Sequence, residues 1–311
     1  MVREENLDVR TVTLGINLTS CASPDPEQLV DSVYRRITER AANQVEFSTP
    51  GPHLTAAAIG SGMGIISVFQ WYPVDIFGFA VLADSGLTSI ADLEGKTIGT
   101  MTPTTANQVI PILTAAGVDT STVTMVPISD ARVQQLTEGN VDAVWTWDGE
   151  WQQWLAQGTD IAYLSGETVY DSSSNSIIAS TQLVEEYPEL VEGFCRALAK
   201  GCYFCYLNPR AAADIIITEW PSLMVDLDTA ETIVNTAINF MTGGQEVMES
   251  NTIGMHSETS WELMMGDYVK MGVVQEAIPL EKCFTNQFVE GANDWDRAEV
   301  QQDSENYVFN N

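Results

Sequence analysis

The residues best suited to chemistry in this chain of 311 residues are tryptophans, because four of the eight lie within ten positions. They are Trp145, Trp147, Trp151 and Trp154. An apolar segment, residues 141–147, predicts a strand, and the helix predicted after it begins at Asp148 and ends near Gly158. Tryptophan side chains lie where a large flat surface is buried or bound. We therefore predict a small-molecule binding site at this strand-to-helix junction.

Trp147 is the best placed of the four to touch a ligand. It ends the predicted strand, and ligands of open α/β sheets lie beyond the carboxyl ends of strands. We expect its ring to stack on a flat ligand. Trp147, Trp151 and Trp154 also have the i, i+4, i+7 spacing of one helical face. Packing of the helix on the sheet is thus the alternative, which we favour for Trp151 and Trp154.

Two acidic residues, Asp148 and Glu150, follow Trp147. Both carboxylates would accept hydrogen bonds from ring or amino N–H groups of a bound heterocycle. Alternatively, Asp148 caps the helix and Glu150 interacts with the helix dipole. Two acids in an aromatic setting suit an aminopyrimidine, whereas they would repel the oxygens of a sulfonate.

Three threonines, Thr102, Thr104 and Thr105, lie between a predicted strand and the start of a predicted helix. Their hydroxyls and the free backbone N–H groups of the helix would form a site for an anion or a carbonyl group. Capping of the helix explains the same residues equally well.

Polar and aromatic residues follow two further predicted strands. Asn17 and Thr19 end the strand at residues 11–18, and Gln70, Trp71 and Tyr72 follow the strand at residues 64–69. We expect these five residues to form the opposite wall of the site. Packing at a hinge is the alternative for the two aromatic residues.

Strands and helices alternate along residues 11–164, which predicts an α/β fold of mostly parallel sheets flanked by helices. Beyond residue 180 the chain is mostly helical. We therefore predict two lobes, one made of residues 1–82 and 175–311, the other of the inserted residues 83–174. Asp75 is interpreted as the start of a strand that crosses between the lobes, and His53 as a loop residue.

The chain is strongly acidic, with 43 Asp and Glu residues against 13 Lys and Arg residues and a net charge of −30. Such a charge excludes nucleic acid and anionic membranes as direct partners. We interpret it as a solubility device for an extracellular or salty environment. No segment approaches the roughly 18 to 20 uninterrupted apolar residues that cross a bilayer.

Cysteines and histidines offer little chemistry. Five cysteines, an odd and sparse set, do not form a disulfide framework. Cys202 and Cys205 have C-x-x-C spacing but lie on a predicted apolar helix, where we expect them to pack in the core. With only two histidines, we expect no metal site. The N-terminal residues show no export signal, and the lipobox-like residues 18–21, which would tether the protein to a membrane, are better explained as the end of a strand.

Several segments resemble the substrate-binding proteins of bacterial ABC importers. Residues 84–99 are similar to the segment that enters the second lobe of these proteins, and residues 136–145 to their helix, glycine and "VDA" strand. Residues 197–213 and 284–288 match later helices and a C-terminal strand. The resemblance extends over residues 65–290 and is closest to the NMT1/THI5-like branch, which carries thiamine-pyrimidine precursors, taurine, sulfonates and nitrate.

The resemblance implies a two-lobed type II periplasmic-binding fold that encloses a small molecule between its lobes. It implies a monomeric protein, periplasmic or extracellular, whose closed form is recognised by the permease subunits of an ABC transporter, and no cofactor. We expect a small nitrogenous aromatic ligand such as a thiamine-pyrimidine precursor.

Two alternatives remain. The first is a binding protein for taurine, a sulfonate or another small organic anion, with the threonines of residues 102–105 as its anion site. The second is a thiamine-pyrimidine synthase-like enzyme that uses pyridoxal phosphate. Two observations argue against an enzyme. Lys96 belongs to the Glu-Gly-Lys-Thr motif of the binding proteins, so we do not assign it to pyridoxal phosphate. The sequence also contains no nucleophile motif, P-loop or paired-histidine motif. We therefore expect no catalytic residues.

Overall fold

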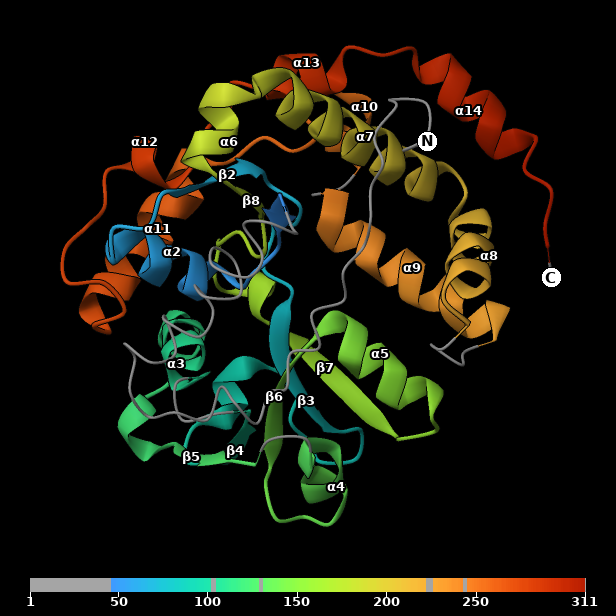
Figure 1. Cartoon of the computed structure of the whole chain (residues 1–311). Helices are drawn as coiled ribbons and strands as arrows, with labels where there is room; N and C mark the ends of the chain where they lie inside the picture. Colours follow the sequence, from blue (N-terminus) through green and yellow to red (C-terminus); the bar gives the residue numbers. More distant parts are fainter. Residues whose placement is uncertain (1–45, 102–104, 129–130, 222–225, 243–244, 311) are drawn as a thin grey trace.

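Two β-sheets, one in each of two lobes, organise the chain (Figure 1). The structure is a computed structural model that describes residues 46–101, 105–128, 131–221, 226–242 and 245–310. The first lobe holds three strands in the order β1 (Phe47–Ser48), β8 (Ile177–Ser180) and β2 (Ile65–Phe69). The second lobe holds five strands in the order β5 (Thr124–Pro127), β4 (Thr97–Thr100), β6 (Ala143–Trp147), β3 (Phe77–Leu82) and β7 (Ile161–Ser165).

The two-lobed α/β fold agrees with the prediction, but the strand directions are more mixed than predicted. β4 runs parallel to β5 and β6, whereas β3 runs antiparallel to β6 and β7. In the described part of the first lobe, β8 is antiparallel to both β1 and β2. Parallel neighbours need a crossover connection. β3 instead arrives directly from the other lobe, so it enters the second sheet against the direction of β4 and β6.

Helices cover both faces of the second sheet. η3 and α3 pack on one face around Trp145, and α4 and α5 pack on the other face around Val144. Trp154 is buried in the second cluster and Trp151 packs against it, as expected for residues that fix a helix on a sheet. The helical elements of this lobe are η3 (Ile90–Leu93), α3 (Ala106–Ala115), η5 (Thr120–Thr122), α4 (Arg132–Thr137), α5 (Asp148–Ala156) and η7 (Gly166–Thr168).

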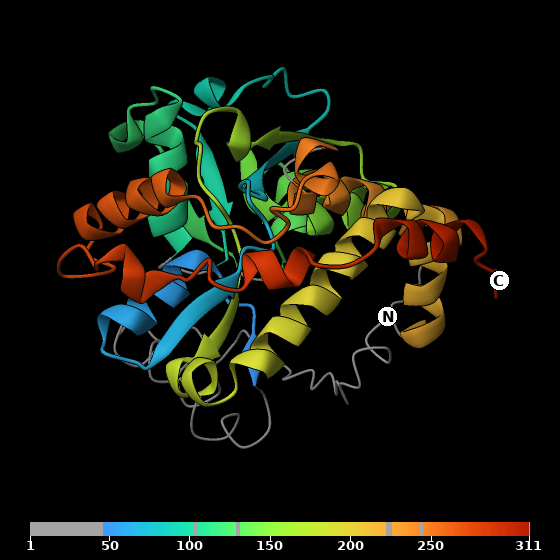
Figure 2. The same ribbon diagram turned by 90° about the horizontal axis from the view of Figure 1, so that it is seen from above.

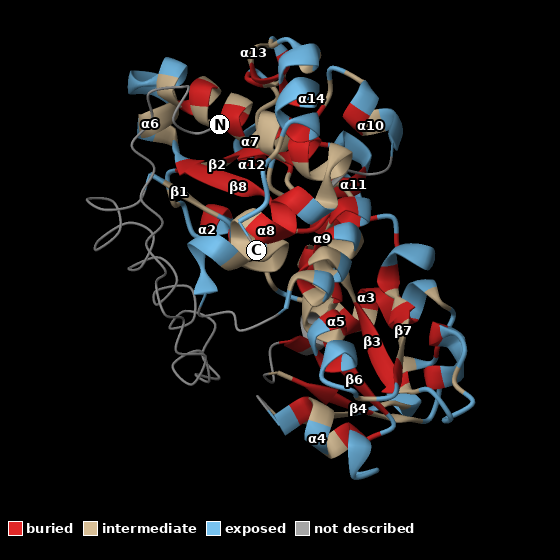
Figure 3. Ribbon diagram, turned by 90° about the vertical axis from the view of Figure 1, so that its right-hand side faces the viewer, coloured by how far each residue is buried: buried red, intermediate tan, exposed pale blue. Residues whose placement is uncertain are grey.

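The first lobe is mostly helical, and its sheet is buried between helices (Figure 3). α7 covers one face of the sheet, while α2 and α11 cover the other (Figure 2). The helices of this lobe are α2 (Pro52–Gly60), α6 (Thr181–Glu186), α7 (Pro188–Leu207), α8 (Pro209–Glu219), α9 (Leu227–Thr242), α10 (Gln245–Glu249), α11 (Glu258–Lys270), α12 (Leu280–Cys283), α13 (Val289–Asn293) and α14 (Arg297–Glu305).

Two chain segments, residues 70–76 and 169–176, connect the lobes and run side by side; we call them the crossing segments. The backbone N–H of Tyr72 donates to the carbonyl of Asn175 at 3.0 Å, and the N–H of Ser174 donates to the carbonyl of Tyr72 at 2.9 Å. β3 begins directly after the first crossing segment and pairs within the second sheet. The predicted lobe boundary at residue 82 is therefore too late, because periodicity reveals a strand but not its partner.

The lobes also touch on the far side of the crossing segments. There α9 of the first lobe contacts α5 of the second lobe. Figure 1 shows α2, α3 and α11 on one side of the crossing segments, and α5 and α9 on the other. The crossing segments thus lie between two regions where the lobes meet.

Candidate functional site

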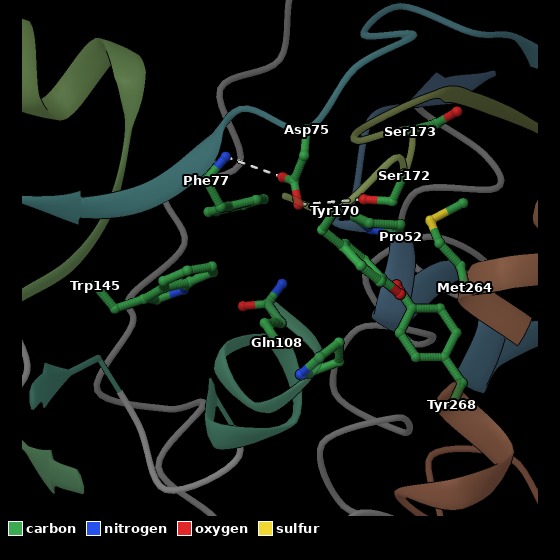
Figure 4. A pocket seen from close by; sticks show the side chains of 11 residues that line it. Pro52, Asp75, Phe77, Gln108, Trp145, Tyr170, Ser172, Ser173, Met264 and Tyr268 are labelled. Atoms are coloured by element: carbon green, nitrogen blue, oxygen red, sulfur yellow. Dashed lines mark hydrogen bonds between the residues drawn. The ribbon is translucent and has the colours of Figure 1, made fainter. Parts of the chain in front are cut away.

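A cavity lies between the lobes, beside the crossing segments and on the side of α3 and α11. Its empty space measures about 340 Å³ when open space at its mouth is counted, and about 30 Å³ of this admits the centre of a water molecule. Both lobes and both crossing segments contribute to its lining (Figure 4). The lining residues are Pro52, Met264 and Tyr268 of the first lobe, Phe77, Gln108, Pro111 and Trp145 of the second, and Asp75, Tyr170, Ser172 and Ser173 of the crossing segments.

Stacked aromatic rings form one wall of this cavity. The rings of Phe77 and Trp145 are nearly parallel, with centroids 5.5 Å apart and planes 10° from each other. The edge of Phe79 packs on Trp145 and fixes its orientation. The indole Nε1 of Trp145 is buried and has no hydrogen-bond partner within the described residues. Buried indole N–H groups usually find an acceptor, so this wall offers a flat apolar face and one unpaired donor.

Asp75 places a carboxylate in the cavity from the first crossing segment. Its Oδ1 accepts a hydrogen bond from the backbone N–H of Phe77 at 3.0 Å, and its Oδ2 accepts one from the hydroxyl of Ser172 at 3.2 Å (Figure 4). Burial, which disfavours the charged form, raises the pKa of Asp75 to about 7. Glu167 raises this pKa further, while the two hydrogen bonds oppose the shift.

The second crossing segment adds hydroxyl groups to the same cavity. Ser172 is bound to Asp75, whereas the Oγ of Ser173 is buried without a partner within the described residues. The hydroxyl of Tyr170 donates to Asp267 of α11 at 2.7 Å and so ties this segment to the first lobe. Two buried hydrogen-bonding atoms of the cavity lining therefore have no partner in the described part of the chain: the indole nitrogen of Trp145 and the hydroxyl oxygen of Ser173.

A hydrogen bond between His53 and Gln108 crosses the gap between the lobes. The Nε2 of Gln108, in α3, lies 2.7 Å from the Nδ1 of His53. His53, predicted to lie in a loop, is instead the second residue of α2. Burial lowers the pKa of His53 to about 4, so its neutral ring accepts from the Gln108 amide. This bond holds the first turns of α2 and α3 together at the rim of the cavity.

Trp147, the tryptophan predicted to contact a ligand, is half-buried and is not among the lining residues. Its ring lies 5.6 Å from the guanidinium carbon of Arg132, which also lies 5.7 Å from the ring of Trp154. Trp145 lines the cavity instead. Alternation along a strand places both tryptophans on one face, but only the position of the crossing segments shows which of them meets the cavity.

The two predicted acids have different environments. The Oε1 of Glu150 accepts from Arg132 at 2.6 Å and its Oε2 from the hydroxyl of Thr146 at 2.6 Å, so both oxygens are engaged. Asp148 is the first residue of α5 rather than its cap, since Trp147 occupies the cap position. Burial raises the pKa of Asp148 to about 6, against hydrogen bonds from the backbone of α5. Neither residue lines the cavity.

Gln70, Trp71 and Tyr72 lie in the first crossing segment. The Nε2 of Gln70 donates to the carbonyls of Tyr72 and Ser174, at 2.9 and 3.1 Å, and its Oε1 accepts from the Trp261 indole. Gln70 is therefore occupied in holding the two crossing segments together. Trp71 packs against the core of the first lobe and stacks on Tyr72. For Trp71 and Tyr72, these contacts agree with the alternative prediction, in which the two rings pack where the lobes join.

The remaining predicted residues lie at or beyond the edge of the described chain. Thr105 is buried directly before α3, and its side chain does not cap that helix. Asn17, Thr19, Thr102 and Thr104 lie outside the described residues.

Asp75, Trp145 and Ser173 were missed as site residues by the sequence analysis. The signal for Trp145 was present, because strand alternation predicts that it shares a face with Trp147. Asp75 carried a weaker signal as an acid in a segment predicted to connect the lobes. A serine in the run of residues 172–174 carried none.

The described residues contain no group of three or more His, Cys, Asp and Glu side chains arranged to hold a metal ion. Cys202 is buried, and burial raises the pKa of Cys205 to about 11, which keeps this thiol protonated. Within the same residues, no helix combines the length and the apolar character needed to cross a membrane.

The fold defines a two-lobed protein of the type II periplasmic-binding class. The family model described as NMT1/THI5 like matches residues 31–212, which is more than half of the chain. The chain therefore belongs to the NMT1/THI5-like family. A second family model, described as an uncharacterised ACR, matches residues 1–50.

Among curated proteins, the chain is similar to the riboflavin-binding protein RibY of Chloroflexus aurantiacus. The two are 24% identical over 269 residues, which cover 85% of this chain and 76% of RibY. A UPF0210 protein of Desulforudis audaxviator is 48% identical over only 46 residues, which are 15% of this chain and 10% of that protein.

Solved structures share the fold at low sequence identity. The putative periplasmic sulfonate-binding protein SsuA of Methylobacillus flagellatus has a TM-score of 0.62 at 14% identity, and 91% of each chain is covered. The desulfurization enzyme DSZB has a TM-score of 0.55 at 15% identity, covering 88% of this chain and 94% of that one. The fold is thus found in binding proteins of ABC importers and also in an enzyme.

Proposed function

We propose that this chain is the solute-binding component of an ABC importer and captures a small, flat nitrogen heterocycle of the thiamine-pyrimidine precursor type. The observation that carries the proposal is the composition of the cavity. Stacked aromatic rings from Phe77 and Trp145 lie beside one buried carboxylate, Asp75. Such rings suit a planar ligand, and the carboxylate suits its N–H groups.

The charge of the cavity favours this ligand class over a sulfonate. Within the described lining residues, Asp75 carries the only carboxylic acid and no Lys, Arg or His is present. Above its raised pKa of about 7, the buried Asp75 carboxylate has no cation among the lining residues and repels an anionic ligand. The name of RibY, a riboflavin-binding relative, points to a planar nitrogen heterocycle as well. The sulfonate alternative is supported by the name of the similar SsuA structure and by the two unpaired groups on Trp145 and Ser173, which would also bind sulfonate oxygens.

The same composition argues against the enzyme alternative. Chemistry with pyridoxal phosphate needs a lysine that forms a Schiff base. No lysine lines the described part of the cavity. As a binding protein, the chain would act in the periplasm or outside the cell, as a monomer, and deliver its ligand to the permease subunits. Ligand binding must favour the closed arrangement of the lobes to signal occupancy.

A thermal-shift and calorimetry screen of aminopyrimidines, thiamine, riboflavin, taurine, nitrate and an alkanesulfonate tests this function. We expect stabilisation by one or more heterocycles and none by the anions. A ligand at one hundred times its dissociation constant adds about 2.7 kcal/mol to the free energy of unfolding. Stabilisation by sulfonates alone would contradict the proposal. A new absorbance band after addition of pyridoxal phosphate would favour the enzyme.

Two tryptophan variants locate the ligand. Trp145→Phe keeps an aromatic ring in the wall but removes the unpaired indole N–H, so we expect about a tenfold loss of affinity. Because Phe fills less of this fully buried position, we also expect a loss of fold stability of about 1 to 3 kcal/mol. Trp147→Phe is the matched control, because Trp147 packs by Arg132 and not in the cavity. If calorimetry shows that only Trp147→Phe weakens binding, the ligand lies where the sequence pattern suggested and not in this cavity.

A further inference from the structure

Asp75 and Ser172 join the two crossing segments inside the cavity. The hydrogen bond between their side chains, at 3.2 Å, connects residues 97 positions apart in the chain. The other Asp75 oxygen is held by the backbone N–H at the start of β3. One hydrogen bond to each oxygen thus fixes the position of the carboxyl group before any ligand binds.

The Asp75 carboxylate retains capacity to accept further hydrogen bonds. An ionised carboxylate has about four lone-pair sites, and the protein contacts described above use two of them. Asp75 is 6% exposed. The groups that act on its ionisation are Glu167 and the donors of Phe77, Ser172 and Ile76, and no cation is among them. An N–H donor of a ligand would stabilise this buried carboxylate.

Hydrogen-bond donors that complement the Asp75 acceptor lie elsewhere on the cavity wall. The Nε1 of Trp145 is a donor only, and the Oγ of Ser173 is a donor or an acceptor. Both atoms are buried, and neither has a partner within the described residues. Figure 4 shows Trp145 and Asp75 on different sides of the cavity, with Phe77 between them. A flat ligand against the Phe77 and Trp145 rings would therefore meet an acceptor at one edge and donors at another.

We propose that Asp75 is the specificity-determining residue of this site, and that it selects ligands whose ring carries an exocyclic amino or ring N–H group. The inference rests on the proposed function, since it assumes that a heterocycle binds in this cavity. The chemical class is a planar ring with an N–H donor at one edge and a ring nitrogen or carbonyl acceptor at another. Asp75 accepts a hydrogen bond from Ser172. A ligand that binds this carboxylate is therefore linked through Asp75 to the second crossing segment.

A matched ligand pair tests the inference on the unaltered protein. Calorimetry compares an aminopyrimidine with the methylpyrimidine in which a methyl group replaces the amino group. We expect the amino compound to bind at least about tenfold more tightly, because the methyl compound leaves a buried acceptor unpaired. Equal affinities would overturn the role of Asp75 while leaving the proposed function intact. Failure of every heterocycle to bind would instead contradict the proposed function.

The variant Asp75→Asn tests the residue itself. The amide cannot accept at both ends, so we expect the preference for the amino compound to fall to about twofold or less, while the methyl compound binds as before. Asp214→Asn is the matched control, because Asp214 is a fully buried carboxylate that binds Tyr307 and Asn310 far from the cavity. An equal loss for both ligands in Asp75→Asn would show a structural role and overturn the inference. The ligand pair above still decides the question if this variant does not fold.

Discussion

Pairing of side chains decides which of the predicted residues are available to a ligand. Glu150 looked like a ligand-binding acid because it lies in an aromatic segment at the start of a helix. Its partners, Arg132 and Thr146, lie four or more residues away and engage both of its oxygens. Sequence shows residue types but not these partners, so it cannot separate a paired acid from an unpaired one.

The variant Glu150→Gln distinguishes the two roles. Arg132 is buried, with only 3% of its side chain exposed, and would lose the charge that compensates its own. We expect the free energy of unfolding to fall by about 2 kcal/mol in urea titrations, with ligand affinity changed less than twofold. Glu138→Gln, an exposed substitution in the same lobe, serves as control. A loss of affinity without a loss of stability would restore Glu150 as a ligand contact.

At the scale of helices and strands, most elements were predictable and their partners were not. Periodicity and glycine positions located β6 and α5 within about two residues. The start of the helical region expected beyond residue 180 is divided into two helices, because Pro188 begins a new helix. α2 was missed, since its alanine-rich sequence shows little apolar periodicity. The cavity depends on how these elements meet, which no local pattern encodes.

A buried histidine connects three elements of the first lobe and makes its stability sensitive to acid. The Nε2 of His256 lies 2.6 Å from the hydroxyl of Ser67, in β2, and its Nδ1 lies 2.9 Å from the Oδ1 of Asn286. The same Oδ1 accepts from the backbone N–H of His256. Asn286 is therefore an acceptor here, so Nδ1 carries the proton and Nε2 accepts from Ser67.

Burial lowers the pKa of His256 from 6.5 to about 4. Between these values only the unfolded chain binds the proton, so the contribution of His256 to the free energy of unfolding falls as the pH is lowered through this window, by about 2 kcal/mol from pH 7 to pH 5. Denaturant titrations should show a smaller decrease in His256→Gln than in the unaltered chain. The lowered pKa of His53 changes the free energy of unfolding in the same direction. Asp75 changes it in the opposite direction, because its raised pKa stabilises the fold at low pH. This stabilisation is lost as the pH rises through about 7. An identical pH profile for His256→Gln would contradict this origin of acid sensitivity.

At the scale of the whole molecule, the net charge of −30 opposes the compact state. Added salt shortens the range of this repulsion, since the Debye length falls from about 30 Å at 0.01 M to about 3 Å at 1 M. We expect the melting temperature to rise steadily over that range in sodium chloride. Sucrose at matched osmolality is the control, because it leaves the charges unscreened. A melting temperature that does not depend on salt would show that the acidic residues are spaced too widely to repel one another.

If the cavity is the ligand site proposed above, the contact between α5 and α9 constrains how the ligand enters. These helices meet on one side of the crossing segments and the cavity lies on the other. A rotation of the lobes about the crossing segments that widens the cavity mouth therefore compresses the α5–α9 contact. The range of opening, and with it the rate at which a ligand escapes, then depends on side chains that never touch the ligand.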